Sequence, residues 1–120
     1  MVDYRKNVLM RIMGVSKMAE ITKADWKLFA EKLSLWQERY MEHLLQEYAA
    51  IIAKTDVASS RFWELIEKID ADKKNPGVQL TLRKSEMMVD LLYMIRHDVI
   101  TLEDLDAFSE SVVRDIKRYL

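Results

Sequence analysis

Two aspartates, Asp70 and Asp72, have the spacing of the first and third ligands of a calcium-binding loop. Such a loop also needs an oxygen ligand at its fifth position, a glycine at its sixth and a bidentate glutamate at its twelfth. The chain has Lys74, Asn75 and Thr81 at those positions. Because a lysine at the fifth position would repel the cation, we do not predict a calcium site. The two acids are typical of a solvated helix end.

Four basic residues flank the only proline of the chain, Pro76, and form a cluster that could bind an anion. No acidic residue interrupts the segment 73–84 that contains them. A turn with free backbone N–H groups, followed closely by a helix N-terminus, favours anions. We therefore name a candidate anion-binding cluster, with a solvated basic rim as the simpler alternative: Lys73, Lys74, Arg83 and Lys84.

The two histidines do not complete a metal site. His43 precedes Glu47 by four residues, which is the spacing of an ordinary helical pair. The Glu-x-x-His motif of di-iron bundles would need an acid where the chain has Tyr40. His97, at the expected end of a helix, suits the helix dipole. The sequence also lacks a glycine-rich phosphate loop, a nucleophile motif and any cysteine, so we predict no metal, no cofactor and no enzymatic activity.

The composition indicates which elements carry these residues. The 120 residues include only two glycines and one proline, half are apolar and 32% are charged. A β-rich domain needs more turn residues, so we predict an all-α protein, a bundle of four or five helices in a single domain over 1–120. No apolar run approaches the roughly 20 residues of a membrane span. With no cysteine either, we expect a cytoplasmic protein that does not bind membranes.

One long helix is central to the predicted bundle. Thr22 is a good N-cap, with Asp25 three residues later, and no helix breaker follows before Lys54. A straight helix over 23–54 would be roughly 48 Å long, whereas a compact domain of this length is about 35 Å across. The helix therefore either kinks or projects, and a projecting helix with two apolar stripes needs another surface. From these stripes we name six candidate interface residues: Trp26, Leu35, Trp36, Met41, Leu45 and Ile52.

Shorter helices are predicted on both sides of the long one from their apolar spacing. They are expected over 3–13, over 61–74 with a cap at Ser59 or Ser60, over 83–97 and over 102–118. In the helix over 61–74, four apolar residues are expected to face inward: Phe62, Leu65, Ile66 and Ile69. The last two helices should form a C-terminal αα-hairpin, with Thr101 and Asp104 at the N-cap and N3 positions of the second.

The turn over 75–78 is a candidate internal hinge, because proline and glycine stop the preceding helix there. Apolar residues then alternate at Val78, Leu80 and Leu82. This pattern predicts either an extended segment packed on helices or a strand that pairs with another chain.

The residue types favour interaction over catalysis. A net charge of −1 gives no general attraction for nucleic acid. The eight methionines and three tryptophans suit a packed core, but the same residue types are enriched in interface cores. We therefore predict a non-enzymatic interaction or regulatory module that forms a homodimer or binds a partner protein through an aromatic and methionine-rich helical surface. Two alternatives stay open: a nucleic-acid-binding protein that uses the basic segments 5–17 and 73–84, and a protein that binds an apolar small molecule between its helices.

Overall fold

The computed structural model describes residues 20–120, and this part of the chain is all-α, as predicted. The predicted helix over 3–13 and the basic segment 5–17 lie outside the described residues. No strand occurs within 20–120. The elements, in chain order, are four α-helices and two short 3₁₀-helices: α2 (Lys23–Ile52), α3 (Ala58–Asp72), η2 (Lys84–Glu86), α4 (Met87–Arg96), η3 (Leu102–Leu105) and α5 (Glu110–Arg118).

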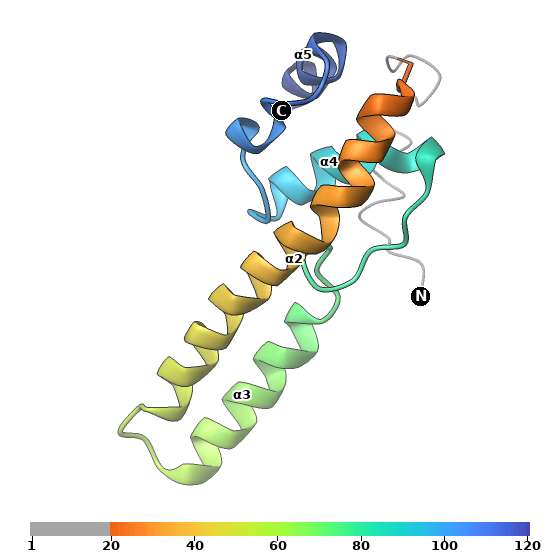
Figure 1. Cartoon of the computed structure of the whole chain (residues 1–120). Coiled ribbons are helices and arrows are strands. Elements are labelled where there is room, and N and C mark those ends of the chain that lie inside the picture. The colour runs from red at the N-terminus through yellow and green to blue at the C-terminus, as the bar shows by residue number, and fades with distance from the viewer. Residues whose placement is uncertain (1–19) are drawn as a thin grey trace.

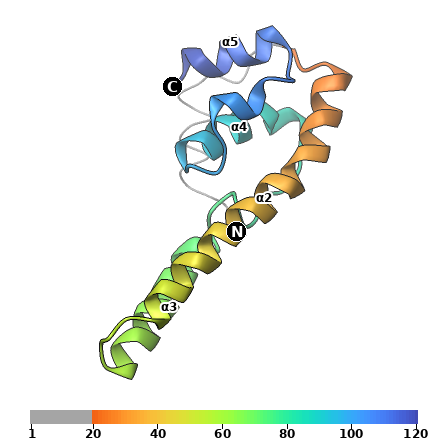
Figure 2. The ribbon, with the colours of Figure 1, turned by 60° about the vertical axis from the view of Figure 1, so that its left-hand side comes forward.

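The long helix α2 projects beyond the core of the molecule. It begins where predicted, because the Thr22 side chain accepts a hydrogen bond from the Asp25 backbone N–H at 3.0 Å. Its 30 residues run without interruption, and the molecule measures 53 × 27 × 22 Å. The first half of α2 packs with α4 and α5, whereas the second half lies beside α3 alone (Figures 1 and 2). We call the second half of α2, from Tyr40 onward, together with α3 the arm.

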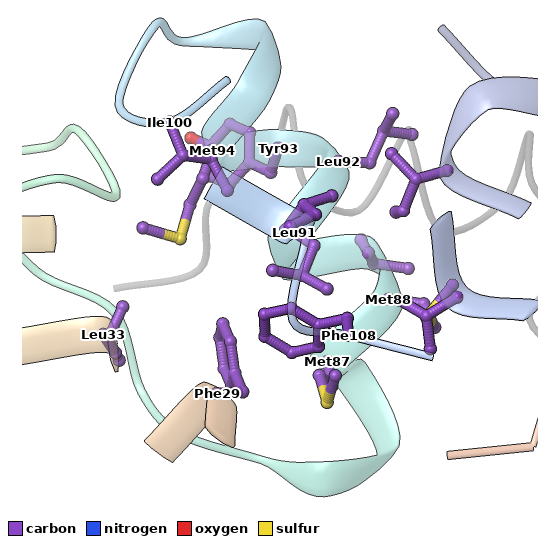
Figure 3. Packing of buried hydrophobic residues seen from close by; sticks show 14 of the residues in the cluster. Phe29, Leu33, Met87, Met88, Leu91, Leu92, Tyr93, Met94, Ile100 and Phe108 are labelled. Carbon is purple, nitrogen blue, oxygen red and sulfur yellow. The ribbon is translucent and has the colours of Figure 1, made fainter. Parts of the chain in front are cut away.

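Helix α4 forms the centre of the core. Its first eight residues, Met87–Met94, are all buried. Phe29 and Leu33 of α2 approach this helix from one side, and Phe108 approaches it from the segment before α5 (Figure 3). Three of the residues in α4 are methionines, whose unbranched side chains fill irregular spaces. The core therefore accounts for part of the high methionine content.

The prediction of a single continuous helix over 102–118 is wrong. Thr101 and Asp104 do form the predicted capping box, but η3 ends at Leu105 and α5 starts only after Ser109. The reason is a long-range contact that the periodicity does not encode. The Asp25 carboxylate of α2 accepts hydrogen bonds from Ser109 N–H at 2.9 Å and from Ser109 Oγ–H at 2.8 Å. This contact holds Ser109 in extended backbone as the N-cap of a new helix. The C-terminal hairpin of α4 and α5 thus contains η3 in its connection.

One further helix boundary differs from prediction, the start of α3, whereas the end of α4 agrees with prediction to within one residue. α3 begins at Ala58 with Val57 as its N-cap and no side-chain cap, so the caps predicted at Ser59 or Ser60 are wrong. α4 ends at Arg96 in a Schellman motif, with Val99 N–H bonded to Met94 O at 2.9 Å. Asp98 occupies the left-handed position of this motif with a φ of 60°. The start of α3 and the end of α4 are therefore determined by the path of the backbone and not by capping side chains.

The connection from arm to core is a buried turn fixed to α2. Asn75 Nδ2–H donates to the Tyr40 hydroxyl at 3.0 Å, and Gln37 Nε2–H donates to Pro76 O at 3.1 Å. Pro76 and Gly77 are buried. The following segment over 78–82 is extended without strand pairing among the described residues, and Leu80 packs on the core. The candidate hinge over 75–78 is therefore anchored on α2, and its movement stays a prediction.

Gly77→Ala is expected to lower the free energy of unfolding by about 1–3 kcal/mol through overpacking. A Cβ at Gly77 would lie 2.3 Å from Tyr40 Cδ2, near the base of a ring that cannot easily move. The φ angle of Gly77 is outside the left-handed region, so the backbone itself accepts alanine. Urea denaturation of Gly77→Ala, Tyr40→Ala and the double variant measures the effect.

The double variant separates this steric contact from a backbone effect. Removal of the Tyr40 ring should make Gly77→Ala neutral or slightly stabilising, because alanine restricts the unfolded chain. The same loss of stability with and without the Tyr40 ring would contradict the prediction.

Candidate interaction surface on the helical arm

One edge of the arm is closed by ion pairs. Lys68 Nζ lies 2.8 Å from Glu47 Oε2, and Lys54 Nζ lies 2.5 Å from Glu64 Oε1. These pairs join the antiparallel helices α2 and α3 along one side of their contact line. We call these four residues the polar edge.

A hydrogen-bonded network connects the polar edge with the base of the arm across the contact between the two helices. The Tyr48 hydroxyl donates to Asp72 Oδ2 at 2.8 Å, and Lys68 Nζ lies 3.1 Å from the same oxygen. Burial and the acceptor Asp72 raise the pKa of Tyr48 to about 12, so the phenol stays protonated. The hydrogen bond to Glu47, together with Asp72, raises the pKa of Lys68 above its ordinary value. Polar contacts thus help to hold the arm together, and α3 has no buried residue.

The other edge of α2 in the arm is apolar. Leu44 and Ile51 are buried and face α3. At about 100° per residue, Met41, Leu45 and Ile52 lie roughly 70–110° to one side of them, away from the polar edge. Leu45 is 58% exposed and Ile52 is 55% exposed.

The same edge of α3 is also apolar. Phe62, Ile66 and Ile69 follow the i, i+4, i+7 spacing of one helical row, on the side of α3 opposite to Glu64 and Lys68. Phe62 is 57% exposed and Ile69 is 39% exposed. Because the two helices are antiparallel and the ion pairs fix one edge, both rows lie along the opposite edge. The apolar edge comprises six residues: Met41, Leu45, Ile52, Phe62, Ile66 and Ile69.

An exposed tryptophan borders the apolar edge. Trp63 is 60% exposed, and its ring lies edge-on to Phe62 with the ring centroids 5.3 Å apart. An exposed apolar area that exceeds a few hundred Å² marks an interaction site on a soluble protein. Tryptophan and phenylalanine are also the residue types that anchor such sites. The arm therefore carries the strongest candidate for an interaction surface among residues 20–120.

The structure separates the six candidate interface residues into three groups. Met41, Leu45 and Ile52 share the apolar edge. Leu35 is 64% exposed but lies about 80° around the helix from Leu45, outside that edge. Trp36 and Trp26 belong to the core: Trp36 is 4% exposed, and Trp26 packs against the buried cluster.

Sequence reasoning missed the contribution of α3. Phe62 and Ile69 were expected to face inward, and that expectation is wrong because both are exposed. Helix α3 is amphipathic whether or not a neighbour covers its apolar row. The spacing of that row therefore could not predict whether its residues are buried or exposed. The signal that could have identified the surface is the pair Phe62 and Trp63, since adjacent helical residues point about 100° apart and one short helix cannot bury both.

The structure does not bring the four basic residues of the candidate anion-binding cluster together. Lys73 and Lys74 follow α3, near the turn bonded to Tyr40. Arg83 and Lys84 stand at the other end of the extended segment, where Lys84 and Ile21 line the same shallow hollow. Tyr40 and Lys23, the first residue of α2, are separated by roughly 26 Å of helix. Anion binding by either pair stays a prediction.

Other candidate chemistry finds little support in the described residues. His43 Nε2 lies 3.5 Å from Glu47 Oε1 in an ordinary i, i+4 contact. Within residues 20–120, no three histidine, aspartate or glutamate side chains gather as a metal site, and no helix has the length and apolar character to cross a membrane. A second hollow, beside α5, is also open and is lined largely by charged residues: Asp106, Phe108, Glu110, Val113, Arg114 and Lys117.

Comparison with known proteins gives no match for this chain among protein-family models, curated proteins or solved structures.

Proposed function

We propose that this protein is a non-enzymatic self-association module whose apolar edge joins two copies into a homodimer. The observation that carries the proposal is the apolar edge itself, with Leu45, Ile52, Phe62 and Ile69 exposed in two adjoining rows. Helical surfaces of this kind are stable when a second layer covers them. No residue within 20–120 provides that layer, since the core packs on the first half of α2.

A second copy fits this surface better than an arbitrary partner. Two helices form half of a four-helix bundle, and a second arm supplies the other half through an isologous contact. Lys68 lies beside Glu47 and Asn75 beside Tyr40, so Leu45 is about level with Ile69 and Ile52 with Phe62. The two rows therefore present layers of matching height to a second arm.

The size of the surface also supports a dimer of modest affinity. A stable interface buries about 800 Å² from each partner, and each fully covered aromatic side chain contributes about 150–250 Å² of that. Phe62 and the five other residues of the apolar edge, with Trp63 at its border, supply the apolar part of this area. The remaining parts of the proposal, a cytoplasmic location and a role without catalysis, are supported by the absence of cysteine and of nucleophile motifs.

The substitution Leu45→Glu is expected to abolish dimerisation, and Leu35→Glu provides a matched control. Both leucines lie on α2 and are more than half exposed, but only Leu45 is in the apolar edge. Glutamate is a good helix former, so both variants should remain folded. Light scattering at high and low salt should give twice the 14.2 kDa chain mass for the wild type and Leu35→Glu, and the monomer mass for Leu45→Glu.

Two outcomes would overturn the proposal. A wild-type mass of 14.2 kDa at all protein concentrations would rule out self-association. A dimer that Leu35→Glu disrupts and Leu45→Glu leaves intact would place the contact elsewhere. Circular dichroism of each variant confirms that a change in mass does not reflect unfolding.

A further inference from the structure

The apolar edge ends in charges of opposite sign at the base of the arm. On α2, Glu38 precedes Leu45 by seven residues and so continues the same row, with Glu42 beside it. At the C-terminal end of α3, the C-cap Lys73 follows Ile69 by four residues and continues that row, with Lys74 next to it.

The acidic and basic residues are level along the arm but lie on opposite flanks. The contacts of Lys68 with Glu47 and of Asn75 with Tyr40 place Lys73 at the height of Glu42. Glu38 and Glu42 lie on the flank of α2 that faces away from α3. Consequently they do not pair with the lysines of the same copy: within residues 20–120, Glu38, Glu42 and Lys74 have no ion-pair partner. Lys73 has an exposed pair with Asp70 at 3.1 Å.

Two orientations would cover the apolar edge with a second arm. If the two-fold axis is parallel to α2, each α2 lies against α3 of the partner copy, and the acidic flank meets the partner's basic flank at the same height. If the axis is perpendicular to α2, each α2 lies against the partner's α2, and Glu38 and Glu42 meet the tip of the arm near Asp56. The basic residues of that tip are already bonded within their own copy, Lys54 to Glu64 and Arg61 to the backbone carbonyls of Ile52 and Asp56. Only the first orientation pairs all four charged residues, and like or unpaired charges suppress the second.

We infer that the two arms associate in the same direction, with Glu38 and Glu42 of each copy contacting Lys73 and Lys74 of the other. This inference rests on the proposed self-association. In this arrangement, Lys73 and Lys74 bind the carboxylates of Glu38 and Glu42 in a second copy. The charges set the orientation, whereas the apolar edge supplies most of the affinity, because exposed ion pairs contribute little each.

Charge reversal with exchange tests this orientation. An acid-reversed variant carries Glu38→Lys and Glu42→Lys, and a base-reversed variant carries Lys73→Glu and Lys74→Glu. All four side chains are exposed, so both variants should keep the fold. At low salt, each variant alone should dissociate with a constant raised on the order of tenfold. An equimolar mixture should recover the wild-type constant, because the heterodimer pairs lysines with glutamates at both contacts.

The outcomes distinguish this inference from the proposed function. A wild-type dimer whose dissociation constant is unchanged in both reversed variants would overturn the orientation and leave self-association standing. So would a mixture that associates no more tightly than either variant alone. A monomeric wild type would instead overturn the self-association on which the inference rests. High salt should reduce the difference between the variants and the wild type, since the contacts are exposed.

Discussion

Replacement of Trp36 by alanine is expected to lower the free energy of unfolding by about 3–5 kcal/mol, because it leaves a large cavity in the core. Trp36 is only 4% exposed. Its ring centroid lies 6.2 Å from that of Phe29 and 6.3 Å from that of Phe108. The indole thus joins α2 to the segment that precedes α5. A loss of this size is a large fraction of the ~5–15 kcal/mol that stabilises a typical domain.

Chemical denaturation followed by circular dichroism measures this loss, and Leu35→Ala is the control. Leu35 is the adjacent residue on the same helix but is 64% exposed, so its truncation should change stability by less than about 0.5 kcal/mol. Trp36→Phe, which keeps an aromatic ring, should cost less than Trp36→Ala. If the two alanine variants were equally stable, the placement of Trp36 in the core would be wrong.

The contrast between Leu35 and Trp36 illustrates what the sequence could predict about α2. Its start at Thr22 and its uninterrupted length depend on local contacts and on the absence of breakers, and both predictions are confirmed. Which side of the helix is covered depends on where α3 and α4 pack, and two adjacent apolar residues do not reveal that. An interface at the six candidate residues therefore stays a prediction, and the structure places only Met41, Leu45 and Ile52 together on one edge of the arm.

The same limit applies to the last two helices. The capping box of Thr101 and Asp104 lies within four residues and was predictable. The interruption after Leu105 depends on Asp25, which is 84 residues from Ser109 in the sequence. The bidentate pair of Arg39 and Asp104, with N···O distances of 3.1 and 2.9 Å, joins α2 to η3 over a similar separation. Contacts of this range have no local sequence pattern, so the periodicity alone favoured one continuous helix.

The contact between Asp25 and Ser109 leads to the second large effect. Substitution of Asp25 by alanine is expected to lower the free energy of unfolding by about 2–3 kcal/mol, since hydrogen bonds to a charged group contribute about 1.5–3 kcal/mol. Asp25 is 3% exposed and accepts from Ser109 N–H, Ser109 Oγ–H and, at 2.9 Å, Thr22 Oγ1–H. Its negative charge also lies at the N-terminus of α5, which the helix dipole favours. Asp25→Asn keeps the shape of the side chain and should lower the free energy of unfolding by less than Asp25→Ala does.

The pH dependence of stability identifies the carboxylate as the group responsible. Burial raises the pKa of Asp25, but the hydrogen bonds from Ser109 and Thr22 outweigh it, so the pKa lies below its ordinary value of 3.8. A lowered pKa in the folded state means that the unfolded chain binds the proton more readily. The contribution of Asp25 is therefore complete above about pH 4 and is lost as the pH falls through the folded-state pKa.

Measurement of unfolding free energies from neutral to acidic pH for the wild type and Asp25→Asn isolates this contribution. Asp104, whose pKa is also lowered by Arg39 and Thr101 against the effect of burial, titrates in both proteins and cancels in the difference. The stability advantage of the wild type should shrink as the solution becomes more acidic than about pH 4. Parallel curves at all pH values would contradict the assignment. A shrinking difference would instead establish that one carboxylate on α2 fixes the start of α5, and hence the helix boundary that sequence periodicity could not locate.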